Sequence, residues 1–535
     1  MSDAIVLVGL PGSGKSAVGR LVAARLGRPF IDLDLLIAER EGRSSAAIIA
    51  ADGEPAFRVC EAAAVQAAAA VPGAVIATGG GAPIDPLNRW TLWHAGRVVW
   101  LDAPDPVLLA RLAGDRVERP LLRGDAVAAL AALRAARSRY YGAADLHLAG
   151  DEPPERLADR VVAAAAAPRP AARRLLDAQV RRDHPMGPRT AHILFGVGLD
   201  RATLRDALDP LSTGAPIVVA DERAAAAQPD LLAALPDDRR ILIRAGERRK
   251  RLRTAEALLE TAAELGAERG DAWVAMGGGT TGDLVGTAAA LYFRGAPLVQ
   301  LPTTWLAMAD AAIGGKVAVD LSAAKNSAGA FWPPVAVIGD VAALRTLPRA
   351  RMLDGMGESL KSGLIGDPWL WELVERRGRA ALRGDEAARY ALVERAATLK
   401  LGIVERDPFE AGERRLLNLG HTLGHALEIE SRYRLAHGQA VVLGLRAVVH
   451  MAAGRGADAG LAERIDTAIA GLGYAMTRSF DPVAVKAALR GDKKRHKGRQ
   501  RWILPMGVGR MEEADDISDE ELAAAMRHIH AEGTR

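Results

Sequence analysis

Apolar runs alternate with alanine-rich stretches of helical periodicity over the first 150 residues. The runs are IVLVGL at 5–10, FIDLD at 30–34, AVIATGGGAP at 74–83 and VVWLDAP at 98–104. Short runs of this kind, separated by helical segments, predict the strands of a parallel sheet with helices on both faces. We therefore expect an α/β domain with a parallel sheet over residues 1–165.

A stretch rich in alanine, proline and arginine follows, and residues 166–189 are interpreted as a linker. Strand-like runs then return between HILFGVG at 192–198 and VAVIGD at 335–340, so residues 190–349 predict a second α/β domain of the nucleotide-binding kind. Residues 350–535 have mainly the period of helices, with one late strand in WILPMGVG at 502–509. The last domain is therefore expected to be α-helical.

Composition narrows the class of protein. A chain of 535 residues is too long for one hydrophobic core, so several domains are expected. No apolar run reaches about 18 residues, so no transmembrane helix is expected. The N-terminus has no basic leader, and a single cysteine, Cys60, is typical of a reducing compartment, which together favour a cytoplasmic location. A net charge of +4 gives little reason to expect nucleic-acid or membrane partners, so small-molecule substrates are expected.

Lysine and asparagine are scarce in this chain. Only ten of the 70 basic residues are lysines, and there are three asparagines. Because a lysine is a compact charge with a tunable pKa, each one is a candidate for chemistry that arginine could not perform. The basic run RGDKKRHKGRQR at 490–501 is compatible with a nucleic-acid patch, a solvated loop or an anion site.

The segment GLPGSGKS at 9–16 lies between an apolar strand and a helical stretch, which is the context of a phosphate-binding loop. Glycines allow backbone N–H groups to surround phosphate oxygens, a lysine reaches the β- and γ-phosphates, and a serine hydroxyl can bind Mg²⁺. The sequence thus predicts a nucleotide site made of Gly12, Ser13, Gly14, Lys15 and Ser16.

Acidic and basic side chains after the loop indicate the phosphate acceptor. Asp32 and Asp34 end the second strand, where one could support Mg²⁺ and the other could accept a proton from a substrate hydroxyl; two solvated carboxylates are the alternative. Arg58 could clamp a carboxylate, and Arg116 and Arg119 precede PLL as lid candidates.

The motifs GxxGxGKS, FIDLD, GEPAFR, TGGGAP and RPLL, in this order over about 120 residues, resemble those of shikimate kinase. The resemblance implies phosphorylation of a shikimate hydroxyl by ATP with Mg²⁺ on Ser16 and Asp32. It gives catalytic roles to Lys15, Asp34 and Arg116 and shikimate contacts to Asp34, Arg58, Gly80 and Arg137. The segment RSRYYGAAD departs from the family pattern, so Arg134 stays an alternative to Arg137. Gluconate and adenylate kinases share the loop, but FIDLD with TGGG favours shikimate.

A second set of candidates lies after the linker. A glycine triplet, 277–279, ends a predicted strand in AWVAMGGGTTGDLVG and could let a pyrophosphate approach the backbone, although GxGxxG is absent. His421 and His425 are four residues apart and so share a helix face, and His437 follows. Thr422 stands where HExxH has glutamate, which disfavours a zinc protease. With Glu358, two histidines would leave an open position on a metal; ordinary core or surface histidines are the alternative.

The order GGGxxGD, YFRG, PTT, MADAAIGGK, KNSAGAFW, GESLKSG, RRLLNLGHTLGHALE, HGQA and DKK, over about 300 residues, resembles 3-dehydroquinate synthase. The resemblance implies Zn²⁺ (or Co²⁺) on Glu358, His421 and His437, bound NAD⁺, and conversion of 3-deoxy-arabino-heptulosonate 7-phosphate into 3-dehydroquinate. It also implies a homodimer formed through this half of the chain, in which Arg294 reaches the substrate phosphate across the interface.

The same resemblance implies the remaining site residues. Cofactor contacts fall on Glu247, Lys250, Gly278, Gly279, Asp283, Thr303, Thr304 and Lys325. Substrate and catalytic contacts fall on Asp310, Lys316, Lys361, Lys400, Arg414, Asn418, His425, Lys493 and Lys494. Gln439 stands where the family usually has glutamate, and ESLKSG replaces the usual EVIKYG, which puts the partners of the metal-binding His437 in doubt.

Three other interpretations stay open. The C-terminal half could be another sugar-phosphate cyclase or an NAD- and metal-dependent polyol dehydrogenase, although the many lysines disfavour the dehydrogenase. One half could also be a scaffold or a regulatory pseudoenzyme, which the intact Lys15, Asp34 and candidate metal ligands disfavour.

Overall fold

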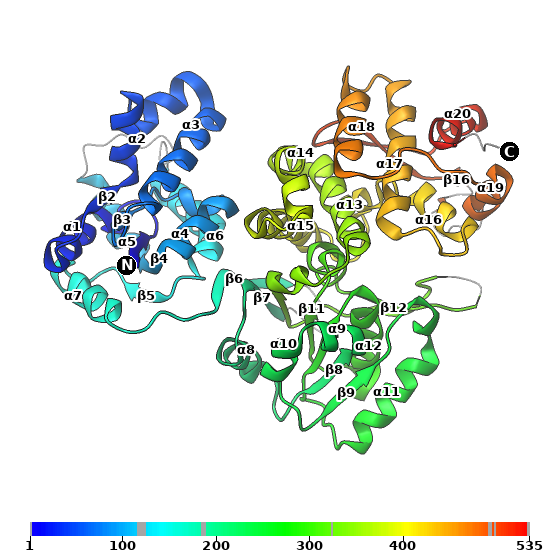
Figure 1. The fold of residues 1–535 in the computed structure, drawn as a ribbon, viewed down its shortest axis with the longest axis horizontal. Coiled ribbons are helices and arrows are strands. Elements are labelled where there is room, and N and C mark those ends of the chain that lie inside the picture. The colour runs from blue at the N-terminus through cyan, green and yellow to red at the C-terminus, as the bar shows by residue number, and fades with distance from the viewer. Residues whose placement is uncertain are drawn as a thin grey trace. The chain divides into compact units, whose positions relative to one another are not determined.

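The computed structural model describes residues 3–114, 125–182, 189–322, 325–490, 495–496 and 499–531. The chain forms two compact units (Figure 1). One comprises Met1–Val180 and His192–Asp200, and the other comprises Arg181–Ala191 and Arg201–Arg535. No helix in the described part of the chain is long and apolar enough to cross a membrane.

The first unit is built on a five-stranded sheet in the order β2-β3-β1-β4-β5, and its neighbouring strands are parallel. The strands are β1 (Ala4–Val8), β2 (Phe30–Asp32), β3 (Val75–Ala77), β4 (Gly96–Asp102) and β5 (Leu146–Ala149). The helices are α1 (Lys15–Leu26), α2 (Leu33–Glu41), α3 (Ser45–Ala69), α4 (Pro86–Ala95), α5 (Asp105–Ala113), α6 (Ala126–Tyr141) and α7 (Pro154–Ala165). The predicted parallel α/β domain is confirmed.

Helices α1 and α7 bury apolar side chains against this sheet. Val18 and Val22 of α1 and Val161 of α7 join Ile5 and Leu7 of β1 in one core cluster. All of β1 is buried. The apolar run at the N-terminus is therefore a central strand whose carboxyl end leads directly into the phosphate-binding loop.

The sheet of the second unit includes five strands in the order β14-β11-β10-β8-β9, and adjacent strands among these are parallel. They are β8 (Ile217–Asp221), β9 (Arg240–Ile243), β10 (Trp273–Gly277), β11 (Leu298–Pro302) and β14 (Ala336–Asp340). The other two strands of this seven-stranded sheet, β6 (Arg173–Arg182) and β7 (Arg189–Val197), are each divided between the two units.

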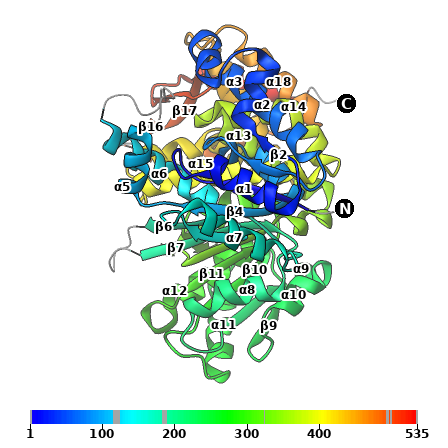
Figure 2. The same cartoon turned by 90° about the vertical axis from the view of Figure 1, so that its left-hand side faces the viewer.

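Five helices accompany these strands (Figure 2). They are α8 (Arg201–Leu208), α9 (Glu222–Ala227), α10 (Pro229–Ala234), α11 (Leu252–Glu264) and α12 (Gly279–Leu291). Leu258 of α11 and Val285 of α12 pack with Trp273 of β10 in one buried cluster. A short antiparallel hairpin, β12 (Lys316–Val319) and β13 (Ala328–Phe331), follows β11.

The remainder of the second unit is mainly helical, as predicted, and lies above the α/β part in Figure 1. Its helices are α13 (Arg349–Gly366), α14 (Pro368–Leu382), α15 (Glu386–Arg406), α16 (His421–Glu430), α17 (His437–Ala453), α18 (Leu461–Leu472), α19 (Pro482–Arg490) and α20 (Asp519–Ile529). The late strand expected in WILPMGVG is β17 (Trp502–Gly507), and it pairs with β18 (Arg510–Ala514).

Residues 166–189, expected to be a linker, differ from that prediction because they include β6. Leu176, Ala178 and Val180 alternate along β6 and are all buried, as the period of a strand requires. The arginines at both ends of this segment gave it the composition of a loop and concealed the alternation. Part of the segment expected to be a linker is therefore a strand.

Glycines allow the helices that carry the two histidines of the candidate metal site to approach very closely. A Cβ at Gly444 of α17 would lie 2.0 Å from the carbonyl oxygen of Gly420, which precedes α16. A Cβ at Gly424 of α16 would lie 3.0 Å from the carbonyl oxygen of Ala440 on α17. A side chain at Gly444 would clash with this backbone, and one at Gly424 would be tightly packed, so these glycines allow the close separation of α16 and α17.

We expect Gly444→Ala to destabilise the protein by about 1–3 kcal/mol, because its methyl group would force α16 and α17 apart. Gly471→Ala is the matched control, since Gly471 lies in α18 and a Cβ there meets no atom within 4 Å. That control should be neutral or slightly stabilising, because alanine favours a helix over glycine. Denaturant unfolding of both variants measures the difference; equal free energies of unfolding would contradict the predicted clash.

Candidate functional site

The phosphate-binding loop of the first unit has a backbone conformation that depends on glycines. Gly9, Gly12 and Gly14 have φ values of 146°, 80° and 92°, which favour glycine. The Lys15 ammonium donates to the carbonyls of Gly9 at 3.0 Å and Leu10 at 2.9 Å. No side chain caps the first turn of α1. The backbone N–H groups of the first turn of α1 and the Lys15 ammonium are therefore suited to bind phosphate oxygens.

Two carboxylates at the end of β2 have different surroundings. Ser16 donates from Oγ to Oδ2 of Asp32 at 2.6 Å, and Oδ1 of Asp32 accepts the Asp34 N–H at 3.1 Å. Because β2 ends at Asp32, Asp34 belongs to the first turn of α2, where Ser45 donates to it at 3.4 Å. Asp32 is therefore placed beside the loop serine and Asp34 is directed elsewhere.

The glycine triplet after β3 brings Asp34, Arg58 and Arg137 together. A Cβ on Gly79 would lie 3.4 Å from Oδ1 of Asp34, one on Gly80 would lie 3.1 Å from Nη1 of Arg137, and one on Gly81 would lie 2.7 Å from Nη1 of Arg58. The glycine backbone is thus lined by two guanidinium groups and by the carboxylates of Asp34 and Glu61, the latter also 3.4 Å from a Cβ on Gly79. This set suits a hydroxylated carboxylic acid.

The two arginines left open by the sequence have different partners. Arg134 donates to Asp102 at 2.6 Å and to Asp105 at 2.7 Å, at the end of β4 and the start of α5. Arg137 is buried and lies beside Gly80. The geometry thus favours Arg137 over Arg134 as the arginine of the acceptor pocket.

Sequence reasoning missed two residues of this site. Glu61 is buried and accepts a hydrogen bond from Nη1 of Arg58 at 2.7 Å, so it orients that guanidinium. Arg111 donates to the carbonyl of Gly12 at 3.5 Å. The three-residue spacing of Arg58 and Glu61 on α3 was the available signal for an ion pair. The lid candidates Arg116 and Arg119 lie outside the described residues.

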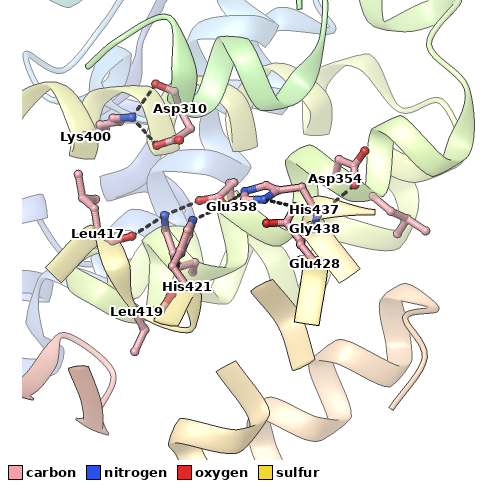
Figure 3. Close-up of polar contacts among 12 residues, drawn as sticks. Asp310, Asp354, Glu358, Lys400, Leu417, Leu419, His421, Glu428, His437 and Gly438 are labelled. Atoms are coloured by element: carbon pink, nitrogen blue, oxygen red, sulfur yellow. Dashed lines mark hydrogen bonds and ion pairs between the residues drawn. The ribbon is translucent and has the colours of Figure 1, made fainter. Parts of the chain in front are cut away.

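The candidate metal ligands of the second unit converge on one oxygen atom (Figure 3). Oε1 of Glu358, on α13, lies 3.3 Å from Nε2 of His421 and 3.2 Å from Nε2 of His437. The histidines are the first residues of α16 and α17. One donor atom from each of the three residues lies within 4.8 Å of the others. Two imidazoles and a carboxylate are a donor set that suits zinc with an open position.

Buried charges shift the pKa values of these ligands. Burial raises the pKa of Glu358, but Lys361, which forms an ion pair with it, and the two histidines outweigh burial and hold that pKa well below its usual value. Burial and the charge of Lys361 lower the pKa of His421. Burial also lowers the pKa of His437, but hydrogen bonds to Glu358 and Glu428 raise it to about 10. Without a metal, His437 is thus the protonated member of the set.

Gln439 hydrogen-bonds to the backbone of Ala475, while both ring nitrogens of His437 face other side chains. The Gln439 amide donates to the carbonyl of Ala475 at 2.9 Å and accepts the Ala475 N–H at 3.0 Å. A glutamate could accept but not donate there. The second partner of His437 is instead Glu428, whose Oε1 lies 3.2 Å from Nδ1.

The expected substrate cations gather near the same carboxylate. Lys400 donates to Oδ1 of Asp310 at 2.6 Å and to the Asp310 carbonyl at 2.8 Å. Arg414 donates to the carbonyl of Gly314 at 2.7 Å, and a Cβ on Gly314 would lie 3.2 Å from Nζ of Lys400. Lys361 donates to the carbonyl of Leu417 at 2.9 Å. Three buried cations therefore favour an anionic ligand.

Glu410 is a member of this cluster that sequence reasoning missed. It forms an ion pair with Lys316 and accepts from Nδ2 of Asn418 at 2.9 Å. Its φ of 61° is unusual for a residue with a side chain. His425, one helical turn after His421, has its ring centroid 5.2 Å from that of His421. Lys493 and Lys494 lie outside the described residues.

The expected cofactor residues gather where β10 and β11 end. Helix α12 begins at Gly279 without a side-chain cap, and a Cβ on Gly278 would lie 3.2 Å from Cγ2 of Thr304. The N–H of Thr303 donates to the carbonyl of Gly277 at 2.8 Å. The carboxyl ends of parallel strands beside a helix N-terminus form a suitable dinucleotide crevice.

Four charged residues form two ion pairs at this crevice. Lys250 pairs with Asp283, whose pKa is raised mainly by burial. Lys325 pairs with Glu247 at 2.6 Å. Arg294 is exposed in the turn that follows α12, so it faces away from the buried interior of the unit.

Three family models match the chain. A shikimate kinase model matches residues 11–166, a 3-dehydroquinate synthase N-terminal model matches residues 240–354, and a 3-dehydroquinate synthase C-terminal model matches residues 355–495. The first matched segment contains residues 11–16 of the phosphate-binding loop, the second contains the glycine triplet at the end of β10, and the third contains the candidate metal ligands.

Similar proteins agree with these matches. A 3-dehydroquinate synthase of Xanthomonas campestris is 43% identical over 312 residues, which cover 56% of this chain and 84% of that protein. A 2-epi-valiolone synthase of Actinosynnema mirum is 40% identical over 297 residues, covering 54% of this chain and 77% of that protein.

Among solved structures, a 2-epi-5-epi-valiolone synthase of Streptomyces hygroscopicus with NAD⁺ and Zn²⁺ bound is 27% identical, with a TM-score of 0.59. The match covers 65% of this chain and 99% of that one. The motifs, the geometry and the comparisons lead to one identification: the chain belongs to the 3-dehydroquinate synthase family and carries a shikimate kinase domain ahead of the synthase.

Proposed function

We propose that this chain performs two reactions of aromatic biosynthesis. The first unit phosphorylates shikimate with ATP to shikimate 3-phosphate. The second unit converts 3-deoxy-arabino-heptulosonate 7-phosphate into 3-dehydroquinate with release of phosphate. The convergence of His421 and His437 on the buried Glu358, beside several buried cations, is the observation that carries the synthase assignment.

In the kinase, Lys15 and the loop N–H groups hold the phosphates, while Ser16 and Asp32 support Mg²⁺. Asp34 accepts the proton of the attacking hydroxyl, and Arg58 and Arg137 bind the shikimate carboxylate beside Gly80. The hydrogen bonds of Arg58 to Glu61 and the position of Arg137 at Gly80 support these roles. The role of Arg116 in neutralising the transferred charge stays a prediction.

In the synthase, Glu358, His421 and His437 would hold Zn²⁺ or Co²⁺, and the crevice at β10 and β11 would hold NAD⁺. When bound, the two groups would supply reversible hydride transfer and Lewis-acid polarisation at a substrate hydroxyl. The contributing cofactor residues are Glu247, Lys250, Gly278, Gly279, Asp283, Thr303, Thr304 and Lys325.

The other synthase residues bind and orient the substrate. Lys361, Lys400 and Arg414 would neutralise its carboxylate and phosphate, because buried guanidinium and ammonium groups strongly favour anions. Asp310 and Glu410 hold Lys400 and Lys316 in place. Asn418 would donate a hydrogen bond to a substrate hydroxyl, and His425 would donate one or move a proton there.

The domain boundaries expected from the sequence, 1–165, 190–349 and 350–535, stay a prediction. A synthase acting on another sugar phosphate is the main rival, since a valiolone synthase is 40% identical. The kinase domain on the same chain favours 3-dehydroquinate, because both reactions then serve one biosynthetic route. The single cysteine and the use of ATP and NAD⁺ support a cytoplasmic location.

We also propose that the synthase forms a homodimer in which Arg294 serves the partner's site. Phe293 and Arg294 have φ values of 47° and 65°, and Leu291 and Phe293 are each 53% exposed. Two consecutive strained residues that expose apolar and cationic side chains are typical of a functional contact. This arrangement supports an interface at the end of α12.

The synthase reaction is tested with purified protein, heptulosonate 7-phosphate, NAD⁺ and Zn²⁺, without ATP. We expect phosphate in proportion to substrate consumed and no accumulated NADH, because the hydride returns within each turnover. Phosphate and NADH absorbance are measured together. Accumulated NADH would favour a dehydrogenase, and no phosphate from this sugar would favour a cyclase with another substrate.

Two variants control this experiment. His421→Ala should reduce phosphate release to background and leave ATP-dependent phosphorylation of shikimate unchanged. Lys15→Ala should do the reverse. Loss of both activities in either variant would contradict two independent sites.

The dimer is tested by co-expressing Arg294→Ala with His421→Ala. If Arg294 acts across the interface, a mixed dimer has one site with both residues intact, so about a quarter of the wild-type synthase activity should return. The measurement is phosphate release per total chain, compared with each variant alone. Activity no greater than that of the two variants assayed separately would mean that Arg294 acts within its own chain or not at all.

Zinc affinity should rise about tenfold per pH unit between pH 6 and 8. The raised pKa of His437, about 10, means that its ring is protonated in this range and must lose one proton when metal binds. The pKa values of Glu358 and His421 are lowered, which opposes protonation of these two ligands. Calorimetry in two buffers of different ionisation enthalpy measures the proton released; a pH-independent affinity would contradict this charge state.

A further inference from the structure

His437 faces a carboxylate with each of its two ring nitrogens. Nε2 lies 3.2 Å from Oε1 of Glu358, and Nδ1 lies 3.2 Å from Oε1 of Glu428 (Figure 3). Glu428 lies on α16, two turns after His421, and is only 4% exposed. The proposed mechanism gives this buried carboxylate no task.

Two roles are compatible with this position. His425, Glu428 and His437 each offer a donor atom, all within 4.8 Å of one another, so they could form a second cation site. Alternatively, Glu428 accepts a hydrogen bond from the N–H of His437. A neutral imidazole has one lone pair, so metals on both nitrogens of His437 would require the ring to lose its last proton. That requirement favours the hydrogen bond.

The end of α16 holds Glu428 opposite His437. The carbonyl of Glu428 accepts hydrogen bonds from Oγ of Ser431 at 2.7 Å and from the N–H of Tyr433 at 2.8 Å. Arg432 and Tyr433 have φ values of 53° and 59°, so the helix ends in a left-handed turn without glycine. Such a turn is unfavourable for residues with side chains and persists only where surrounding contacts require it. Glu428 is therefore fixed by its backbone as well as by burial.

We propose that Glu428 is a positioning residue for His437. Its carboxylate accepts the Nδ1–H, which places the lone pair on Nε2 and aims it at the point shared with Glu358 and His421. Carboxylates that orient metal-binding histidines in this way raise the basicity of the ring and commonly strengthen metal binding. The inference rests on the metal site of the proposed function and adds to it the residue that sets the orientation and tautomer of one ligand.

The test measures the zinc affinity of the full chain by competition with a chromophoric chelator, so its readout does not depend on turnover. Glu428→Ala should weaken zinc binding about 10- to 100-fold, with one zinc still bound per chain at saturation. Glu430→Gln is the matched control, because Glu430 is on the same helix and pairs with Arg478 at 3.0 Å rather than with a metal ligand. The zinc affinity of this variant should equal that of the wild type.

If the alanine variant does not fold, the isosteric Glu428→Gln variant tests the positioning role of Glu428 instead. Its amide oxygen can still accept the N–H but carries no charge, so we expect about a three- to tenfold loss of affinity. The absorption spectrum of the Co²⁺-loaded protein should change in the alanine variant more than in the glutamine variant.

Three outcomes would overturn the proposal. Wild-type affinity in Glu428→Gln and Glu428→Ala would remove the positioning role. Two zinc ions per wild-type chain and one per Glu428→Ala chain would assign Glu428 to a second cation site instead. No zinc binding by the unmodified protein would overturn the proposed metal site, and with it this inference.

Discussion

The buried carboxylate of Glu358 is the interaction on which the synthase half depends. An ionised group that is only 1% exposed is unfavourable unless partners replace its lost water. Lys361 supplies a charge from the same helix, and His421 and His437 supply two ring nitrogens from α16 and α17. Three helices must therefore meet at one oxygen atom, which explains why their contacts are made through glycine backbone.

Those contacts extend beyond the ligands themselves. Oδ1 of Asp354 accepts the N–H of Gly438 at 3.0 Å, and a Cβ on Gly438 would lie 2.5 Å from Cα of Asp354. Asp354 precedes Glu358 by one helical turn, and Gly438 follows His437 directly. The same close approach thus fixes the register of α13 against α17 and sets the distance between two ligands. The hydrogen bond between Gly438 and Asp354 and their close packing therefore both hold α13 and α17 in this register.

Much of the fold and of the candidate sites was predictable from the sequence, because each motif contains residue types with a known chemical role at a fixed spacing. The loop at 9–16, the paired histidines and the glycine triplets each place a few residues by local rules, and the structure brings most of the named side chains into two clusters. Glu410 was missed because its partner Lys316 is 94 residues away in the sequence. Glu61 and Glu428 lie close in sequence to Arg58 and His437, but they were missed because they orient those residues and the motifs give them no role of their own. Strand β6 was missed because its arginines concealed a buried alternation.

The presence of a kinase domain and a synthase on one polypeptide has a consequence for how the cell can use this protein. Both enzymes come from one translation product, so their catalytic centres are always present in equal numbers. Changes in the expression of this chain therefore scale both of its sites together. Any imbalance between supply and demand at the two steps must then be absorbed by turnover rates and by metabolite concentrations, which makes the relative kcat values of the halves a property under joint selection.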